Sequence, residues 1–172
     1  MRKNIRLFAL ALSLAALSAC SQRRPSDREI ARQRDMNLAE VKRSELGQVG
    51  GRYAGNLLGA SDYEQPVVLN LEVRDVPEGQ SGAGVDPVLV PKLIGYLRFL
   101  YGSEEVGEYS DAPVGSAEYF AAPGRLNLVV VHSQFQDLVL NVSVQGADLV
   151  GVWSAASVGA SGTLRLSREG GR

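Results

Sequence analysis

The chain has few of the residues on which many enzymes and disulfide-stabilised domains depend. Its 172 residues include one cysteine and one histidine. An intrachain disulfide and the usual zinc sites, which need several His and Cys ligands, are therefore excluded. The motifs Gly-x-Ser-x-Gly and Ser-x-x-Lys are missing, as is a phosphate-cradling glycine loop. We accordingly expect no catalytic residues, no cofactor and no metal site.

Long apolar runs and an excess of basic residues are also missing. The apolar run from Leu7 to Leu17 has 11 residues, whereas a helix needs roughly 20 to cross a bilayer. The formal net charge is −1, which gives no reason to expect a nucleic-acid partner. The sequence therefore predicts neither a transmembrane helix nor a nucleic-acid-binding protein.

The N-terminus has the three-part layout of a secretion signal. Basic residues precede the apolar run, and the run leads into Leu17, Ser18, Ala19 and Cys20. This motif resembles the lipobox of bacterial lipoproteins. The resemblance implies cleavage after Ala19, acylation of Cys20 and anchoring to a membrane by acyl chains. Ser21 follows the cysteine where inner-membrane lipoproteins often carry Asp, so the resemblance points to the outer membrane.

We expect a signal peptide over residues 1–19, a charged tether over 20–47 and one domain over 48–172. Within the tether, Ser26 and Glu29 have the spacing of a capping box, which marks a helix start. Good helix formers follow from Ile30 to Leu46, but their apolar residues form no continuous stripe. The pattern predicts a short, largely exposed helix, with Gly47 as its end.

From Gly50 onward the sequence pattern becomes typical of β structure. Residues 67–74 and 138–145 alternate apolar and polar side chains, which is typical of half-buried antiparallel strands. Similar runs separated by turn residues predict about eight strands, near residues 51–59, 66–74, 91–101, 116–121, 125–132, 137–145, 148–155 and 162–168. The fold class is therefore all-β. We expect an antiparallel meander closed into a barrel, with a two-sheet β-sandwich as the alternative.

Glycines close to aromatic rings favour the barrel. Gly55, Gly95 and Gly151 each lie within two residues of Tyr53, Tyr96 or Trp153, as at strand positions where a barrel bends. This order of strands resembles small lipocalin-like barrels of bacterial envelope lipoproteins. Tyr53 stands where true lipocalins carry a Gly-x-Trp signature, so no ligand is carried over from that family. We expect the three aromatic residues in the barrel core.

The remaining chemistry-bearing residues have structural interpretations. His132 shares the parity of inward-facing residues, which favours a strand end or the inner face and a hydrogen-bonded structural role. Acidic residues gather at Glu104, Glu105, Glu108 and Asp111. A solvated loop explains them best, with a calcium site or paired glycosidase carboxylates as alternatives.

Two functions remain open for the domain. The barrel could have a structural or protein-interaction role, with its interior filled by its own side chains and an envelope protein as partner. Alternatively, it could bind or carry an apolar small molecule of the envelope, as eight-stranded barrels can. Inward positions rich in Leu and Val fit either case.

Overall fold

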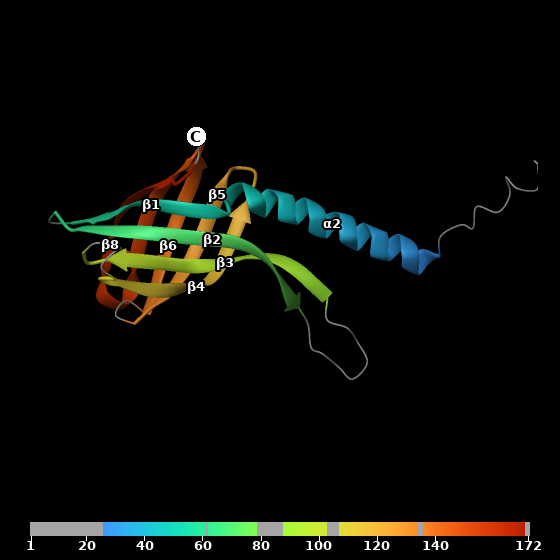
Figure 1. The fold of residues 1–172 in the computed structure, drawn as a ribbon, viewed down its shortest axis with the longest axis horizontal. Helices are drawn as coiled ribbons and strands as arrows, with labels where there is room; N and C mark the ends of the chain where they lie inside the picture. The colour runs from blue at the N-terminus through green and yellow to red at the C-terminus, as the bar shows by residue number, and fades with distance from the viewer. Residues whose placement is uncertain (1–25, 61, 79–87, 103–106, 134–135, 171–172) are drawn as a thin grey trace, which may run out of the picture. The chain divides into compact units, whose positions relative to one another are not determined.

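The computed structural model describes residues 26–60, 62–78, 88–102, 107–133 and 136–170. Helix α2, Asp27–Val49, precedes eight antiparallel strands that form one closed barrel (Figure 1). The strands are β1 Gly51–Gly59, β2 Glu64–Glu78, β3 Val88–Leu100, β4 Tyr109–Phe120, β5 Arg125–His132, β6 Gln136–Gln145, β7 Asp148–Ala155 and β8 Ala160–Arg168, with a 3-10 turn, η2 Ala156–Val158, before the last.

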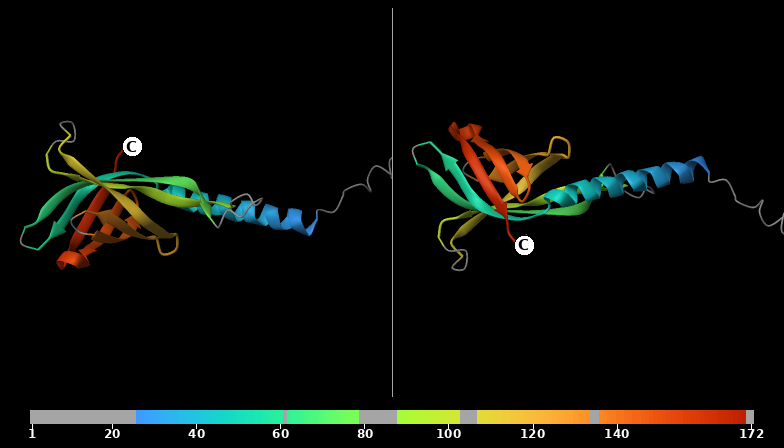
Figure 2. Two further views of the ribbon diagram at one scale, coloured as in Figure 1. Left: turned by 90° about the horizontal axis from the view of Figure 1, so that it is seen from below. Right: turned by 90° about the horizontal axis from the view of Figure 1, so that it is seen from above.

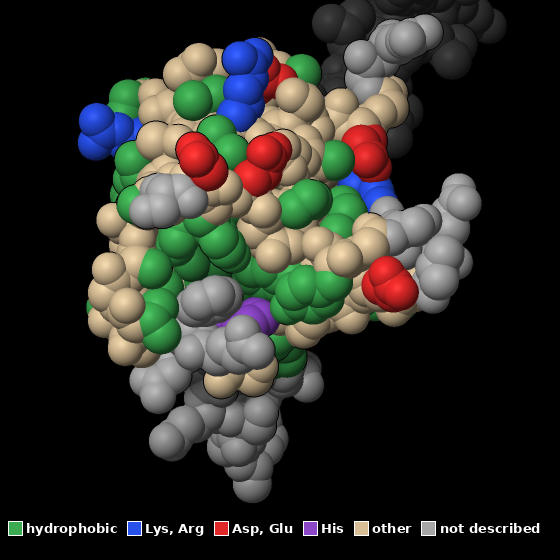
Figure 3. Space-filling model, turned by 90° about the vertical axis from the view of Figure 1, so that its left-hand side faces the viewer, with side chains coloured by type: hydrophobic (Ala, Val, Ile, Leu, Met, Phe, Trp, Pro, Cys, Tyr) green, Lys and Arg blue, Asp and Glu red, His purple; other side chains and the backbone are tan. Residues whose placement is uncertain are grey.

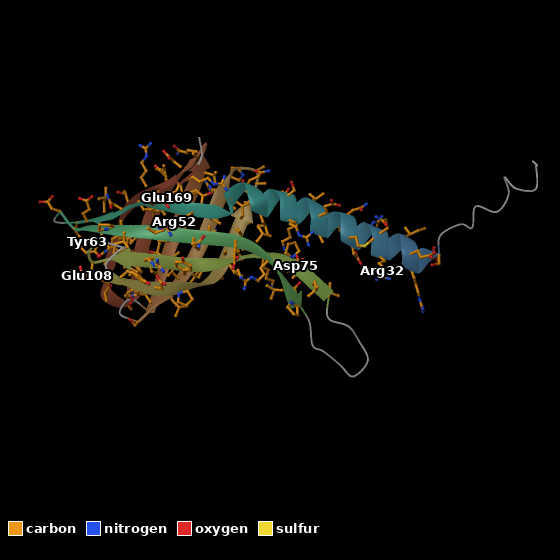
Figure 4. All side chains as sticks on the ribbon, in the orientation of Figure 1. Arg32, Arg52, Tyr63, Asp75, Glu108 and Glu169 are labelled. Carbon is orange, nitrogen blue, oxygen red and sulfur yellow. The ribbon has the colours of Figure 1, made fainter. Side chains whose placement is uncertain are left out.

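Each strand pairs with the next along the chain, and β1 pairs with β8. This last pairing runs from Tyr53 opposite Arg168 to Gly59 opposite Gly162. An ion pair between Arg52 and Glu169 lies beside it, and both residues are labelled in Figure 4. The meander and its closure confirm the predicted barrel, and the alternative β-sandwich is wrong.

The barrel interior holds the apolar side chains predicted from the alternating pattern. All eight strands contribute buried residues to one cluster, and two residues of α2 join it. The members are Leu46, Val49, Tyr53, Leu57, Val67, Leu69, Leu71, Leu93, Leu97, Phe99, Ala112, Leu126, Leu128, Val130, Leu138, Leu140, Val142, Leu149, Trp153, Ala155, Leu164 and Leu166. Burial of this apolar surface is the main force that holds the barrel together.

Helix α2 begins as predicted and ends later. The Ser26 backbone amide donates to Glu29 Oε2 at 2.6 Å, and the Glu29 amide donates to Ser26 Oγ at 3.3 Å, which confirms the capping box. The expected end at Gly47 is wrong, because the helix continues to Val49. Leu46 and Val49 lie on one helix face and are buried in the core cluster. Their packing keeps Gly47 helical.

Most of α2 is exposed, as expected, and its first half belongs to a different compact unit from the barrel. The chain divides into two compact units, Met1–Leu38 and Ala39–Arg172. Ile30, Met36 and Leu38 in the first unit are more than half exposed. The last turns of α2 belong to the second unit, where Arg43 forms an ion pair with Asp75 of β2 at 2.7 Å. Asp75 is labelled in Figure 4.

Several strands extend beyond their predicted bounds. The largest difference is in β4, which was expected from residue 116 and begins at Tyr109. Asp111 and Pro113 in its first half are residue types that are rare in strands, so the sequence did not predict this part of β4. Strands β2 and β3 also run on together beyond β4 as a two-stranded ribbon, which is visible in Figures 1 and 2. This ribbon forms one wall of the candidate site.

Candidate docking groove between β3 and β4

The ladder between β3 and β4 stops halfway along the two strands. It runs over five pairs, from Leu100 opposite Tyr109 to Tyr96 opposite Pro113. Beyond that point β3 continues to pair with β2 as far as Val88, and β4 continues to pair with β5 as far as Phe120. In the described part of the chain, these two halves pair with a strand on one side only. We call this open part of the wall the β3–β4 seam.

Glycines mark the place where the strands separate. A Cβ atom at Gly95 would overlap the carbonyl oxygen of Asn70, so only glycine allows β2 and β3 to approach this closely. On β4, a register shift between Val114 and Ser116 leaves Gly115 as the extra residue of a bulge. A bulge bends its strand and increases the local twist. These two features are consistent with the divergence of β4 from β3.

A groove of about 680 Å³ lies along the β3–β4 seam. Most of its lining is apolar, and Leu46 of α2 and Leu93 of β3 connect it with the core cluster. The lining residues, which define the β3–β4 groove, are Lys42, Leu46, Val76, Pro91, Lys92, Leu93, Ile94, Val114, Gly115, Ser116, Ala117, Glu118, Tyr119 and Phe120. Phe120, at the end of β4, is 48% exposed. The groove therefore offers apolar surface to a partner.

Three charged side chains line the groove. Lys92 Nζ lies 3.2 Å from Glu78 Oε1 in an exposed ion pair. Lys42 and Glu118 make no ion pair with any residue that the structure describes. The groove therefore carries one more positive than negative charge, and its lysines favour a partner that brings a carboxylate.

Within the paired part of the β3–β4 ladder, Arg98 connects the two strands on the outer face. Its guanidinium donates to both carboxylate oxygens of Asp111, at 2.7 and 2.9 Å. The same group lies 3.8 Å from the ring centroid of Tyr109 and 5.2 Å from that of Tyr96. The Arg98 side chain is only 15% exposed. A bidentate pair with stacked rings is the geometry in which an arginine contributes most.

Two of the three aromatic residues expected in the core are there. Tyr53 is buried and its hydroxyl donates to the carbonyl of Val49 at 3.0 Å. Trp153 is buried and its Nε1 donates to the carbonyl of Leu58 at 3.0 Å. The expectation for Tyr96 is wrong: it lies on the outer face, because its neighbours in β3, Leu97 and Gly95, fix the alternation with Leu97 inside. Tyr96 OH instead accepts a hydrogen bond from Asn70 at 3.3 Å.

His132 lies buried at the end of β5, as its parity predicted. Its ring packs against Phe99 of β3, with centroids 4.6 Å apart and planes tilted by 57°. Burial lowers the pKa of His132 below its ordinary value of 6.5, because the charged form is poorly solvated there. The neutral imidazole is thus a packing element of the barrel interior.

Of the four acidic residues singled out in the sequence, the structure describes Glu108 and Asp111. Asp111 of β4 forms an ion pair with Arg98 of β3, and Glu108 lies exposed just before β4. Glu104 and Glu105 lie outside the described residues. Within the described ranges, no group of three or more His, Cys, Asp or Glu side chains is placed to hold a metal ion.

A smaller pocket of about 360 Å³ lies at the turns that follow β1 and β7. It is lined by Gly59, Ala60, Tyr63, Trp153, Gly159, Ala160 and Ser161, and the rings of Tyr63 and Trp153 lie 6.1 Å apart. Figure 3 shows the side of the molecule from which the β1–β2 turn projects, with hydrophobic side chains gathered in its middle. The pocket lies apart from the β3–β4 groove, and their lining residues do not overlap.

The residues of the predicted signal and anchor, Leu17, Ser18, Ala19 and Cys20, lie outside the described residues. Among the helices that are described, none combines the length and the apolar character needed to cross a membrane. The predicted lipid anchor therefore stays a prediction from the sequence.

Comparison with known proteins assigns the chain to no family. No protein-family model matches the chain, and no significant match exists among curated proteins or solved structures. The lipoprotein and lipocalin-like resemblances therefore rest on the sequence patterns, and the barrel rests on the structure.

Proposed function

We propose that this chain is an outer-membrane lipoprotein whose barrel works through protein contacts on its outer surface. Cys20 carries the acyl chains, Leu17 to Ala19 form the cleavage site, and residues after Cys20 form a tether. The lipobox pattern supports the anchor, because it combines a basic start, a short apolar run and a cysteine after small residues. The barrel faces an aqueous compartment, and its partner is another envelope protein.

The packed core cluster is the observation that favours a functional role for the outer surface of the barrel over one for its interior. Side chains from all eight strands meet in it, and Leu97, Leu128 and Leu140 are fully buried. A carrier barrel needs an internal space that a ligand can enter, whereas these side chains occupy the axis of the barrel. The largest opening described above is the β3–β4 groove, which lies on the wall.

A non-catalytic role also fits the residues. The one histidine of the chain is buried against Phe99, and burial favours its neutral form. A general base has to reach the proton that it removes. His132 faces the barrel interior and packs there against Phe99, which supports a structural role for this residue.

Transport of an apolar small molecule is the second candidate, and the lining of the groove is the observation that favours it. About 680 Å³ bounded mainly by apolar side chains has the size and character of a small-molecule site. In that case the ligand lies in the wall of the barrel and not along its axis.

Replacement of Cys20 by Ala tests the anchor. The variant should accumulate as uncleaved precursor and incorporate no labelled fatty acid, whereas the matched Ser21→Ala variant should be processed and labelled normally. Fatty-acid labelling of the Cys20→Ala variant at the level of the parent chain would contradict lipidation at this residue.

Native mass spectrometry of residues 21–172, purified from an envelope extract without detergent, separates the two candidate functions. The protein-interaction role predicts the mass of the polypeptide alone. A stoichiometric excess equal to a lipid or another small molecule would favour the carrier role.

A further inference from the structure

We propose that the open edge of β4, from Ser116 to Phe120, is a docking site for an extended segment of another envelope protein. The segment adds a strand to the barrel wall inside the β3–β4 groove. This inference rests on the proposed function, because it assigns the surface and the kind of partner through which the barrel works.

The two sides of the seam differ in how well they can accept a strand. On β3, Pro91 lacks an amide hydrogen and Lys92 lies beside it, and proline and lysine are the residues that protect an exposed strand edge. On β4, residues 116–120 contain neither, and they pair in regular register with β5. The β4 edge is therefore the side that presents an unbroken row of amide and carbonyl groups.

An extended polypeptide is the occupant that suits this edge. Backbone amide and carbonyl groups need hydrogen-bond partners, and a strand supplies donors and acceptors at the matching spacing. An acyl chain would cover the apolar lining but leave these backbone groups without partners. The edge thus favours a peptide over a lipid.

The side chains of the groove indicate what the segment carries. Ala117 and Tyr119 pack against the core cluster, while Ser116, Glu118 and Phe120 point to the exposed side. Added strands alternate their side chains between two faces, so the segment should place apolar residues toward Leu93 and Ala117. Lys42, which has no ion-pair partner in the described chain, lies on the rim and suits a carboxylate of the partner.

Site-specific photo-crosslinking in living cells tests the proposal on the full chain. A photoreactive amino acid is introduced singly at Ser116, Glu118 and Phe120, and the captured peptides are sequenced by mass spectrometry. Strand addition predicts that the three probes capture one segment of a different envelope protein. The captured positions should be spaced by two residues from one probe to the next, because successive exposed side chains of a strand are two residues apart.

A charge reversal at the rim adds a matched comparison. Lys42→Glu should lower the crosslinking yield from the Glu118 probe about fivefold, the upper range for an exposed ion pair. Arg125→Glu makes the same change of charge on β5, outside the groove, and should leave the yield unchanged. Equal effects of the two variants would contradict the role assigned to the groove.

Four other results would overturn the proposal. Capture of a second copy of this chain would make the groove a homodimer contact, and capture of phospholipid would make it a lipid site. Scattered captures without the two-residue spacing would contradict strand addition, as would no capture at all. A further probe at Arg125 separates the two proposals. Protein captured only there leaves the interaction role standing and removes this site. No protein at any probe also removes this site, and the interaction role falls with it only if native mass spectrometry finds a bound small molecule.

Discussion

The two sides of the barrel are built from similar apolar residues but differ in backbone pairing. The wall of β5, β6 and β7 has eight pairs in each of its two ladders. The ladder between β3 and β4 has five, although these strands have 13 and 12 residues. The comparison teaches that a barrel can close without a complete ladder. The part left open supplies backbone groups and apolar side chains to a partner.

Loss of a core side chain should show the largest difference between the two walls. Leu140 of β6 is fully buried, and Leu140→Ala should lower the free energy of unfolding by about 3 kcal/mol through lost burial and a cavity. Ile94→Ala, which truncates a partly exposed residue of the groove, should cost about 1 kcal/mol or less. Urea unfolding measures both, and equal losses would contradict the view of an open wall.

Alanine at a glycine should have the next largest effect. In Gly151→Ala, the new methyl group would overlap the carbonyl of Asn141 in the complete wall, with a cost of about 2 kcal/mol. In Gly115→Ala, it would meet the half-exposed Val131 side chain at 3.0 Å, which can shift, and the Val129 carbonyl oxygen at an ordinary contact distance of 3.6 Å. The change should therefore stay within about 1 kcal/mol. Thermal unfolding of both variants tests this, and the opposite order would refute it.

Loss of an arginine ion pair should lower the free energy of unfolding more at the short β3–β4 ladder than at a complete ladder. Arg98→Ala removes a partly buried bidentate pair and two ring contacts where the β3–β4 ladder is short, and should cost about 1–2 kcal/mol. Arg165 of β8 pairs with Asp148 of β7, and these two strands share a ladder of eight pairs. Arg165 is 72% exposed, so Arg165→Ala should cost about 0.5 kcal/mol or less. Denaturant unfolding with both variants provides the comparison, and similar costs would contradict this difference between the ladders.

The pH dependence of stability should show the smallest effect, through His132, whose ring joins β5 to β3 at Phe99. Burial lowers the pKa of His132 in the folded state below 6.5. The unfolded chain therefore binds more protons than the folded chain just below pH 6.5, and the free energy of unfolding falls as the pH decreases. The loss levels off once folded His132 is protonated as well.

The variant His132→Leu should flatten this slope whatever its effect on overall stability, because the chain has no other histidine. Unfolding free energies measured from pH 7 down to pH 5 provide the test, and an unchanged slope in the variant would show that another group titrates in this range.

The sequence predicted the barrel because period-two alternation and glycine turns are local signals. At Gly146, for example, β6 and β7 are joined by a two-residue hairpin turn with positive φ at the glycine. The capping box at Ser26 and Glu29 was equally readable, since it depends on neighbours three residues apart.

The groove could not be predicted in the same way. It depends on where two strands stop pairing, and residues 109–115 carry no alternation that distinguishes a strand from a loop. Gly95 was recognised as a bend, but the divergence from β4 becomes visible only with the register. The continuation of α2 past Gly47 had a similar cause, because burial of Val49 is a tertiary contact.

Amide hydrogen exchange, resolved residue by residue by NMR, tests the open seam most directly. In residues 138–142 of β6, which pair on both sides, we expect uniformly slow exchange. In residues 116–120 of β4, alternate amides that face the seam should exchange rapidly, while those bonded to β5 stay protected. Uniformly slow exchange along β4, matching that of β6, would contradict an open edge and remove the basis for docking there.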